Sequence, residues 1–307
     1  MRLGIDVGGT KTAAVVLDAD GGVVSHVAAP SGHGPDGTLA VALDVAGRAA
    51  SVVGGWAGVD RVGVCMPGLV DPVSGWARHA VNLGVEALDL AGGVEAACGL
   101  RPGVDNDVKA AALGALHWSP PGSPVARAAY LNAGTGLAAA LVDGDTVLRG
   151  VDGVAGELGH LPVGTGVPCS CGQTGCLETV ASGSALHRLW PGEPADLFPA
   201  AASGEAAALE VVATLAGGLG LAVQVLVLAG AELVLVGGGL ARDREALERA
   251  VRADLRDRSA ASPFLARLDL ADRVTVLDGT APLAAVGAAL LPVPAAGPRP
   301  LATPASA

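Results

Sequence analysis

The pattern of hydrophobic positions predicts a strand, loop and strand plan that occurs twice along the chain. Near the start, residues 2–7 and 12–17 are apolar and β-branched and flank a glycine loop at 8–11, and a third strand is expected over 23–28. Residues 128–148 repeat this order, so we interpret the chain as a diverged duplication. The second copy is expected to have strands at 128–132, 137–142 and 146–148 and a loop at 134–136.

Helical and strand patterns alternate through the rest of the chain, which is typical of an α/β layered fold. Helices are expected over 37–54, 108–117, 178–189, 205–229, 243–256 and 282–291, and strands over 59–65, 233–236 and 274–277. A chain of 307 residues exceeds what one hydrophobic core usually supports, so we expect two lobes. The Pro- and Ala-rich segment 292–307 is expected to be a disordered tail.

Composition and charge exclude several classes of partner. The net charge is -11 and lysine occurs only at 11 and 109, so the chain lacks the basic face that a nucleic-acid binder needs. The most apolar stretch, 219–235, contains polar residues and glycine and predicts a helix followed by a strand, so we expect no membrane partner. Five cysteines without a secretory signal indicate reduced thiols and a cytoplasmic protein.

Two glycine loops are candidates for phosphate binding, because glycines let backbone N–H groups approach an anion. Gly8-Gly9-Thr10-Lys11 is not a Walker A loop, since Thr10 stands where that motif needs glycine and a strand follows instead of a helix. Gly134-Thr135-Gly136 is likewise followed by a hairpin, which excludes the dinucleotide-binding fold. Either loop alone could be only a tight turn, but two loops in matching contexts favour phosphate binding.

A cysteine cluster predicts a structural zinc site. Cys169, Cys171 and Cys176, with His160 upstream, supply the four nitrogen and sulfur ligands that tetrahedral Zn2+ prefers and leave no position for a reactive water. The alternative is a set of buried free thiols. Buried cysteines usually lie among apolar residues, however, whereas glycine and serine separate these.

Several motifs together resemble the ROK family of bacterial sugar kinases and repressors, and most of all its glucokinases. The resemblance runs from about residue 2 to about residue 291. The cysteine segment is its most specific part. The motifs are Asp6 to Lys11, Val104 to Asp107, Leu148-Arg149-Gly150 with Gly156 to His160, and Cys169 to Glu178.

The resemblance implies a two-lobed, actin-like (ribonuclease H-like) α/β fold with sugar and ATP bound in a cleft between the lobes. We assign residues 1–107 and about 281–291 to the N-terminal lobe and 108–280 to the C-terminal lobe. The implied partners are a small-molecule sugar and ATP, with Mg2+ and structural Zn2+ as cofactors. A homodimer is what the family suggests.

The resemblance also assigns roles to individual residues. Asp107 becomes the catalytic base, although Asp105, Asn106 and Asp107 could merely cap the following helix. Asp6 is expected to orient Mg2+ or its water, and His160 to bind zinc while its other ring face meets the sugar. The sugar-binding set is Asn82, Asn106, Asp107, Glu157, His160 and Glu178, and the ATP or phosphate set is Asp6, Gly8, Gly9, Thr10, Lys11, Gly134, Thr135, Gly136, Gly237, Gly238 and Gly239.

Three departures from the family pattern bear on turnover. Asp105 replaces the usual Glu, Lys109 lies where a small or amide residue is commoner, and Leu137 to Ala140 replaces further glycines after the second loop. Extra methyl groups there could crowd the nucleotide or simply pack. Lys109 could pair with Asp105 at i,i+4 or perturb the sugar pocket.

The expected function is ATP-dependent phosphorylation of the 6-hydroxyl of an aldohexose, glucose first. A kinase for an N-acetylhexosamine or another hexose is the near alternative, and a non-catalytic sugar-binding or regulatory protein is the alternative of a different class. A family repressor needs a DNA-binding helix-turn-helix before the first strand, and the first strand is expected at residue 2. An actin-like polymer has no use for a zinc cluster at a sugar site. The preferred hexose, the oligomeric state and the use of polyphosphate are not readable from the residues.

Overall fold

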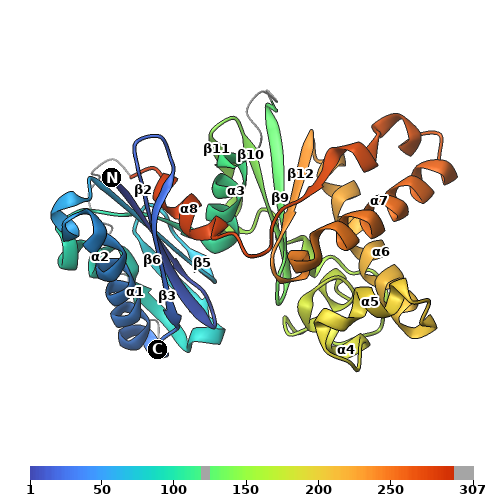
Figure 1. Ribbon diagram of the computed structural model, residues 1–307, viewed down its shortest axis with the longest axis horizontal. Coiled ribbons are helices and arrows are strands. Elements are labelled where there is room, and N and C mark those ends of the chain that lie inside the picture. Colours follow the sequence, from blue (N-terminus) through green and yellow to red (C-terminus); the bar gives the residue numbers. More distant parts are fainter. Residues whose placement is uncertain (119–124, 294–307) are drawn as a thin grey trace. The chain divides into compact units, whose positions relative to one another are not determined.

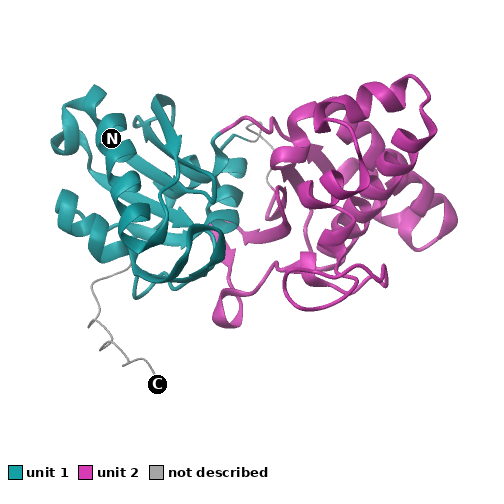
Figure 2. Cartoon of the chain, turned by 90° about the horizontal axis from the view of Figure 1, so that it is seen from below, with its two compact units in different colours: residues 1–118, 282–307 teal, residues 119–281 magenta. Residues whose placement is uncertain are grey.

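A computed structural model describes residues 1–118 and 125–293, and the chain forms two compact units (Figures 1 and 2). Unit 1 comprises Met1–Trp118 and Pro282–Ala307, and unit 2 comprises Ser119–Ala281. Residues 294–307 of the expected disordered tail lie outside the described residues. Each unit is built on one mixed five-stranded sheet.

The sheet of unit 1 has the strand order β3-β2-β1-β4-β8. Strands β1, β2 and β3 are antiparallel, whereas β1, β4 and β8 are parallel. Helix α1 packs on one face of this sheet, and α8 packs on β1, β2 and β4. The bounds are β1 Arg2–Val7, β2 Lys11–Leu17, β3 Val23–Pro30, α1 Gly34–Ala50, β4 Arg61–Met66, β8 Gly103–Asn106, α3 Asp107–His117 and α8 Leu283–Leu290.

A second, three-stranded sheet in unit 1 was not expected from the sequence. It has the order β5-β6-β7 and is followed by helix α2. Its first strand is only two residues long, and exposed residues interrupt the apolar pattern of the other two. The bounds are β5 Leu69–Val70, β6 Trp76–Ala80, β7 Val85–Asp89 and α2 Leu90–Cys98.

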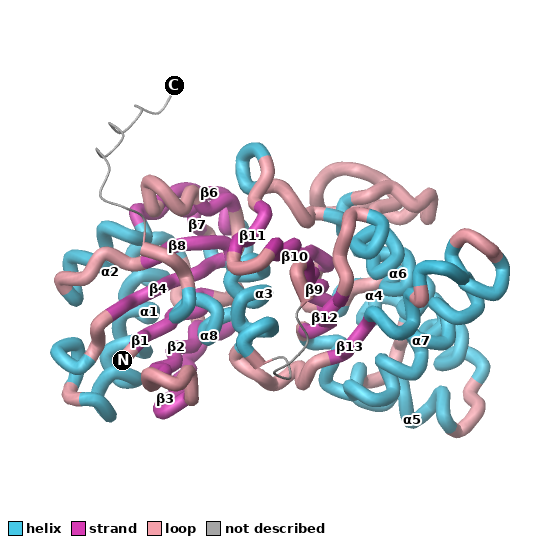
Figure 3. The backbone as a smooth tube through the Cα atoms, turned by 90° about the horizontal axis from the view of Figure 1, so that it is seen from above, coloured by secondary structure: helices cyan, strands magenta, loops and turns pink. Residues whose placement is uncertain are grey.

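The sheet of unit 2 repeats the topology of the first, with the order β11-β10-β9-β12-β13. Strands β9, β10 and β11 are antiparallel, and β9, β12 and β13 are parallel. The expected duplication is therefore visible in the strand order, which Figure 3 shows, and in the matching strand directions. The bounds are β9 Arg127–Ala133, β10 Leu137–Asp143, β11 Thr146–Leu148, α4 Gly183–Leu189, α5 Leu197–Ala202, α6 Ala206–Leu228, β12 Leu233–Gly237, α7 Arg244–Ala261 and β13 Val274–Val276.

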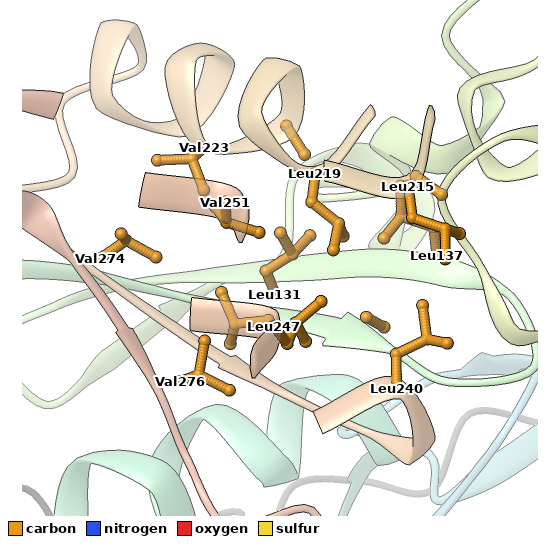
Figure 4. Close-up of a cluster of buried hydrophobic side chains, with 14 of the residues drawn as sticks. Leu131, Leu137, Leu215, Leu219, Val223, Leu240, Leu247, Val251, Val274 and Val276 are labelled. Carbon is orange, nitrogen blue, oxygen red and sulfur yellow. The ribbon is translucent and has the colours of Figure 1, made fainter. Parts of the chain in front are cut away.

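The core of unit 2 consists of leucine, valine and alanine side chains from the sheet and from α6 and α7. Leu131 of β9 lies among Leu219 of α6, Val251 of α7 and Val274 of β13 (Figure 4). By length and composition α6 is the one helix of the described residues that could cross a membrane. It contacts α5, α7 and β12, and one of its faces is buried in this cluster, so it is a core helix of unit 2.

The boundary between the units differs from the expected one. We expected the first lobe to end at Asp107, but the whole of α3 belongs to unit 1, which ends at Trp118 before α8 returns. Close contact between α3 and α8 is the physical reason. A Cβ added to Gly114 would lie 2.0 Å from the carbonyl oxygen of Leu283, and one added to Gly287 would lie 1.6 Å from that of Ala110, so the two backbones touch.

The helix expected over 178–189 is shorter in the structure. Residues Leu177–Thr179 form a single 3-10 turn, and α4 begins only at Gly183. Ser182 ends the intervening segment because its side chain accepts a hydrogen bond from the N–H of Ala185 and caps α4. The cap separates the cysteine segment from the helix.

Candidate functional site

The first glycine loop is held by the end of β3. Gly8 donates to the carbonyl of Lys11 at 3.1 Å, and the Ser31 hydroxyl donates to the carbonyl of Gly8 at 2.6 Å. Thr10 and Lys11 are exposed. A Cβ added to Gly9 would lie 3.3 Å from the Cβ of Asn82, so the structure brings this predicted sugar residue beside the loop.

A row of polar side chains crosses the parallel strands next to this loop. Asp6 of β1 pairs with Cys65 of β4, and Cys65 pairs with Asp105 of β8. Paired residues of parallel strands point to the same face, and the Cys65 thiol is 3.8 Å from Oδ1 of Asp6. Burial, and then repulsion from Asp107, raise the pKa of Asp6 from 3.8 to about 7.

Asp107 is the first residue of α3, and Asn106 is its N-cap. The Asn106 side chain accepts from the N–H groups of Val108 and Lys109, and its amide donates to the carbonyl of Gly68 at 3.2 Å. Asp107 also accepts from Val108 at 2.9 Å. The capping role that the sequence left open therefore belongs mainly to Asn106, and the Asp107 carboxylate lies at a helix N-terminus, where the helix dipole favours its ionised form.

Two of the departures noted in the sequence are buried. Asp105 is 1% exposed and Lys109 is 3% exposed, so both lie inside unit 1. Leu137, Ala139 and Ala140 are 3%, 2% and 0% exposed and pack within unit 2. In the segment Leu137 to Ala140 after the second loop, only Ala138 is partly exposed. Most of the methyl groups of this segment therefore fill the core and do not crowd a ligand.

The second glycine loop abuts the start of α4. Gly183 donates to the carbonyl of Gly134 at 2.7 Å, and Ser184 donates to that of Thr135 at 3.1 Å. The first backbone N–H groups of α4 are thus used to fix the loop. Thr135 itself is exposed.

A pocket of about 830 Å³ opens beside this loop within unit 2. Gly134 and Thr135 line it together with Gly239, so the structure brings the second loop and part of the predicted adenosine loop to one cavity. The size suits a nucleoside. Buried leucines form much of the wall, and the polar or charged lining residues are Thr135, Ser184, His187, Glu193, Arg242 and Asp243.

Each glycine of the predicted adenosine loop meets a different environment. A Cβ on Gly237 would lie 2.6 Å from the Tyr130 hydroxyl. Gly238 has φ of 92°, and its Cβ would lie 2.6 Å from the carbonyl carbon of Ala133. A Cβ on Gly239 would meet nothing within 4 Å, so the chain itself does not require glycine there.

The predicted metal ligands lie together. One ligand atom from each of His160, Cys169, Cys171 and Cys176 falls within 4.8 Å of all the others. Sγ of Cys171 and Sγ of Cys176 are 3.6 Å apart, close to the roughly 3.8 Å edge of a tetrahedron with 2.3 Å zinc–sulfur bonds. A hydrogen bond from the backbone of Gln173 lowers the pKa of the Cys171 thiol to about 7, whereas burial raises the pKa of Cys169 to about 12 and also raises that of Cys176. The geometry and donor set fit zinc.

His160 and Glu178 connect this cluster to the second glycine loop. Nδ1 of His160 is 3.8 Å from Sγ of Cys169, so this nitrogen faces the cluster. Oε1 of Glu178 accepts from Cys169 at 2.9 Å, and a Cβ on Gly136 would lie 3.0 Å from Oε2 of Glu178. Glu157, by contrast, is exposed, and its carboxylate makes no hydrogen bond or ion pair with the residues that the structure describes.

Glycines hold the segment of Glu157 and His160 against β10. A Cβ on Gly156 would lie 1.9 Å from the carbonyl oxygen of Ala139, and one on Gly159 would lie 1.9 Å from that of Leu137. The N–H of Ala139 donates to the carbonyl of Gly156 at 2.8 Å. This backbone contact explains why the segment is rich in glycine.

A match to the ROK family model extends over residues 2–291. The chain belongs to the ROK family. Among its relatives, the glucokinase of Halalkalibacterium halodurans is 31% identical over 81% of this chain and 83% of its own length. The N-acetylmannosamine kinase of Escherichia coli is 29% identical over 61% of this chain and 62% of its own length.

Solved ROK structures share the fold. The ROK family glucokinase from Streptomyces griseus, in complex with glucose and AMPPNP, matches with a TM-score of 0.75 and 28% identity over 94% of this chain and 98% of that chain. A ROK family transcriptional regulator, a homologue of the Escherichia coli MLC protein, matches with a TM-score of 0.76 and 26% identity over 94% of this chain and 76% of that chain. The expected two-lobed, actin-like fold is confirmed.

Several lining residues of the pocket were not predicted from the sequence. Ser184, His187 and Arg242 carry no motif, and Leu197, Phe198 and Leu215 look like ordinary core residues of helices. Only the fold brings these residues to the second glycine loop.

Proposed function

We propose that this ROK protein is an ATP-dependent sugar kinase that phosphorylates the 6-hydroxyl of an aldohexose, with glucose as the first candidate. The observation that carries the proposal is the position of Asp107 at the start of α3, beside an asparagine that already caps the helix. Similarity to a glucokinase over 81% of the chain supports the same activity.

In unit 1, Asp107 is proposed to accept the proton of the attacking sugar hydroxyl. A carboxylate at a helix N-terminus is ionised at neutral pH and can take that proton as the phosphoryl group is transferred. Asn106 and Asn82 are proposed to hold sugar hydroxyls. Thr10 and Lys11 are exposed on the first loop and are proposed to contact phosphate, and Asp6 is proposed to hold Mg2+ or its water.

In unit 2, the pocket beside Gly134 and Thr135 is proposed to bind the adenosine of ATP, with Gly237 to Gly239 along one side. Gly136 completes the phosphate loop. Glu157, His160 and Glu178 are proposed to hold the sugar, because carboxylates and a ring nitrogen match vicinal hydroxyls. The remaining proposed phosphate contacts are Gly8 and Gly9 of the first loop.

Zinc is proposed to have a structural role. His160, Cys169, Cys171 and Cys176 would hold it, and bound Zn2+ supplies rigidity to the segment that carries His160 and Glu178. The chain's own residues then orient the sugar. We also propose that the protein works in the cytoplasm and forms a homodimer.

Two other functions stay as candidates, because each is the function of a protein to which this chain is similar. Similarity to an N-acetylmannosamine kinase makes an N-acetylhexosamine the second candidate substrate. Similarity to a ROK transcriptional regulator makes a sugar-responsive, non-catalytic protein the candidate of another class.

The test is a coupled assay of ADP release from Mg-ATP with a panel of glucose, mannose, fructose, allose, N-acetylglucosamine and N-acetylmannosamine. We expect the protein to phosphorylate one sugar of the panel, and we expect Asp107→Asn to abolish most of that activity. If folded, zinc-containing protein releases no ADP with any sugar of the panel but binds one of them, the regulatory function is the better account.

A further inference from the structure

The pocket of unit 2 needs a positive charge if it is to hold a nucleoside triphosphate. Its charged lining residues include two acids, Glu193 and Asp243, and the chain as a whole has a net charge of -11. A Mg2+-bound triphosphate remains anionic, so a pocket with excess negative charge repels it. Some group beside the pocket must offset this repulsion.

The helix ends around the pocket do not supply that charge. The N–H groups of Gly183 and Ser184 at the start of α4 donate to the loop carbonyls, and that of Ala185 donates to Ser182. At the start of α7, Ala246 donates to the side chain of Asp243. Backbone groups that already donate within the chain are poor phosphate binders, which leaves the amides of the second loop and the side chains.

Arg242 is the arginine among the lining residues of this pocket. It lies in the 3-10 helix Gly239–Asp243, directly after the glycine loop. Its side chain is exposed and makes no hydrogen bond or ion pair with any residue that the structure describes. Two other arginines of unit 2 are engaged: Arg252 pairs with Glu248, and Arg258 pairs with Asp254.

The backbone that carries Arg242 is fixed even though its side chain is not. A Cβ on Gly279 would lie 3.0 Å from the backbone nitrogen of Arg242, so the segment after β13 packs against this turn. Ala241 donates to the carbonyl of Gly238 at 3.0 Å, which closes the turn on the glycine loop. The guanidinium is therefore an uncommitted forked donor on a rigid turn at the rim of the pocket.

We infer that Arg242 binds the phosphate chain of the nucleotide and selects nucleoside polyphosphates over nucleosides. Guanidinium groups match phosphate oxygens with paired, charge-assisted hydrogen bonds. This inference rests on the proposed use of a nucleotide by unit 2. It adds to that proposal a residue outside the family motifs.

The experiment compares Arg242→Gln with the matched control Arg244→Gln. Arg244 is exposed two residues away and does not line the pocket. Calorimetry without sugar measures the dissociation constants of Mg-ATP and of adenosine for the full-length protein. Loss of a charge-assisted contact should weaken Mg-ATP binding by about tenfold to a hundredfold in Arg242→Gln, with adenosine binding within about twofold of wild type.

Other results would overturn the inference. Unchanged Mg-ATP affinity in Arg242→Gln, an equal loss of adenosine affinity, or the same loss in Arg244→Gln would each exclude a specific phosphate contact. Failure of the wild type to bind Mg-ATP would overturn both this inference and the kinase proposal. Binding of Mg-ATP that depends on Arg242, in a protein that phosphorylates no sugar, would leave the inference standing and reject the kinase alone.

Discussion

The two five-stranded sheets share one topology, yet the residues at their corresponding positions differ in kind. Near the end of β1, Asp6 pairs with Cys65 on the neighbouring parallel strand. Near the end of β9, the residue in the same place is Asn132, and it pairs with Gly237 on β12. Unit 1 therefore has ionisable side chains where unit 2 has an amide and a glycine.

This difference indicates how a duplicated frame can acquire two tasks. Half-buried carboxylates near the first glycine loop suit proton transfer and cation binding, and burial together with repulsion from Asp107 raises the pKa of Asp6. Gly239 near the second loop leaves space beside a leucine-lined pocket, which suits the body of a nucleotide. The strand order is retained because it positions both loops, while side chains at the strand ends diverge.

Removal of the proposed base in unit 1 should have the largest effect, and it tests whether unit 1 carries the proton transfer. Asp107→Asn should lower kcat by about a thousandfold, because a positioned general base contributes roughly 10²–10⁴ to rate. Steady-state kinetics with the preferred sugar measure this loss. Asp36→Asn, an exposed acid in the first turn of α1, is the matched control and should retain wild-type kcat. A kcat within about tenfold of wild type in Asp107→Asn would reject Asp107 as the base.

Loss of the metal cluster should affect unit 2 selectively. Cys176→Ser removes a buried thiol of the proposed ligand set, so zinc content should fall from about one ion per chain and the Tm should fall by about 10 °C. Elemental analysis and thermal unfolding measure the two quantities. Cys98→Ser, in unit 1 and outside the cluster, should leave zinc content unchanged. Full zinc content in Cys176→Ser would contradict the predicted ligand set.

A substitution in the glycine loop of unit 2 should have a smaller effect, on ATP binding. Gly239→Ala should raise the KM for ATP by about tenfold without loss of stability, because its Cβ meets no atom of the chain but would meet a bound nucleotide. Kinetics and thermal unfolding measure both. Gly47→Ala in α1 has the same open surroundings and should stabilise the protein by about 0.5–1 kcal/mol with an unchanged KM. An unchanged KM in Gly239→Ala would place the nucleotide elsewhere.

A further effect concerns Asp6 of unit 1, which is half-buried. Because folding raises the pKa of Asp6 to about 7, the stability linked to its proton is fully present below the unfolded pKa and is lost as pH rises through about 7. Between about pH 4 and pH 8, wild type should therefore lose unfolding free energy relative to Asp6→Asn, up to about 4 kcal/mol for a shift from 3.8 to about 7. Urea unfolding at both pH values measures this difference, and Asp20→Asn, exposed in a turn, should track wild type. Parallel pH profiles of wild type and Asp6→Asn would exclude the raised pKa.

Much of the fold could be predicted because the central strands of both five-stranded sheets have continuous apolar runs. The structure confirms strands at 2–7, 128–132 and 233–236 within a residue or two. The β5-β6-β7 sheet could not be predicted, since its strands are short and half exposed. The start of the helix expected over 178–189 was wrong, because the cap residue Ser182 lies inside an otherwise helical pattern and α4 begins only at Gly183.

The candidate site was predictable where spacing along the chain carries the chemistry. Cys169, Cys171 and Cys176 lie close in sequence, so their meeting with His160 follows from one compact loop. The pocket of unit 2 was not predictable, because Leu215 and Arg242 reach it from elements far apart in the chain. The glycines of the pocket could be identified from the sequence, but the apolar and charged residues that line it could not.

The return of α8 to unit 1 has a consequence for how the protein is made. Unit 2 is one continuous segment, whereas the sheet of unit 1 is covered by a helix from the far end of the chain. A Cβ added to Gly4 or Gly63 on that sheet would lie 1.9 or 1.8 Å from a carbonyl oxygen of α8, so the helix backbone packs directly on the strands. During synthesis the first unit to emerge from the ribosome is therefore the last to be completed, and a nascent chain that stops before Pro282 leaves an apolar face of the sheet open to aggregation.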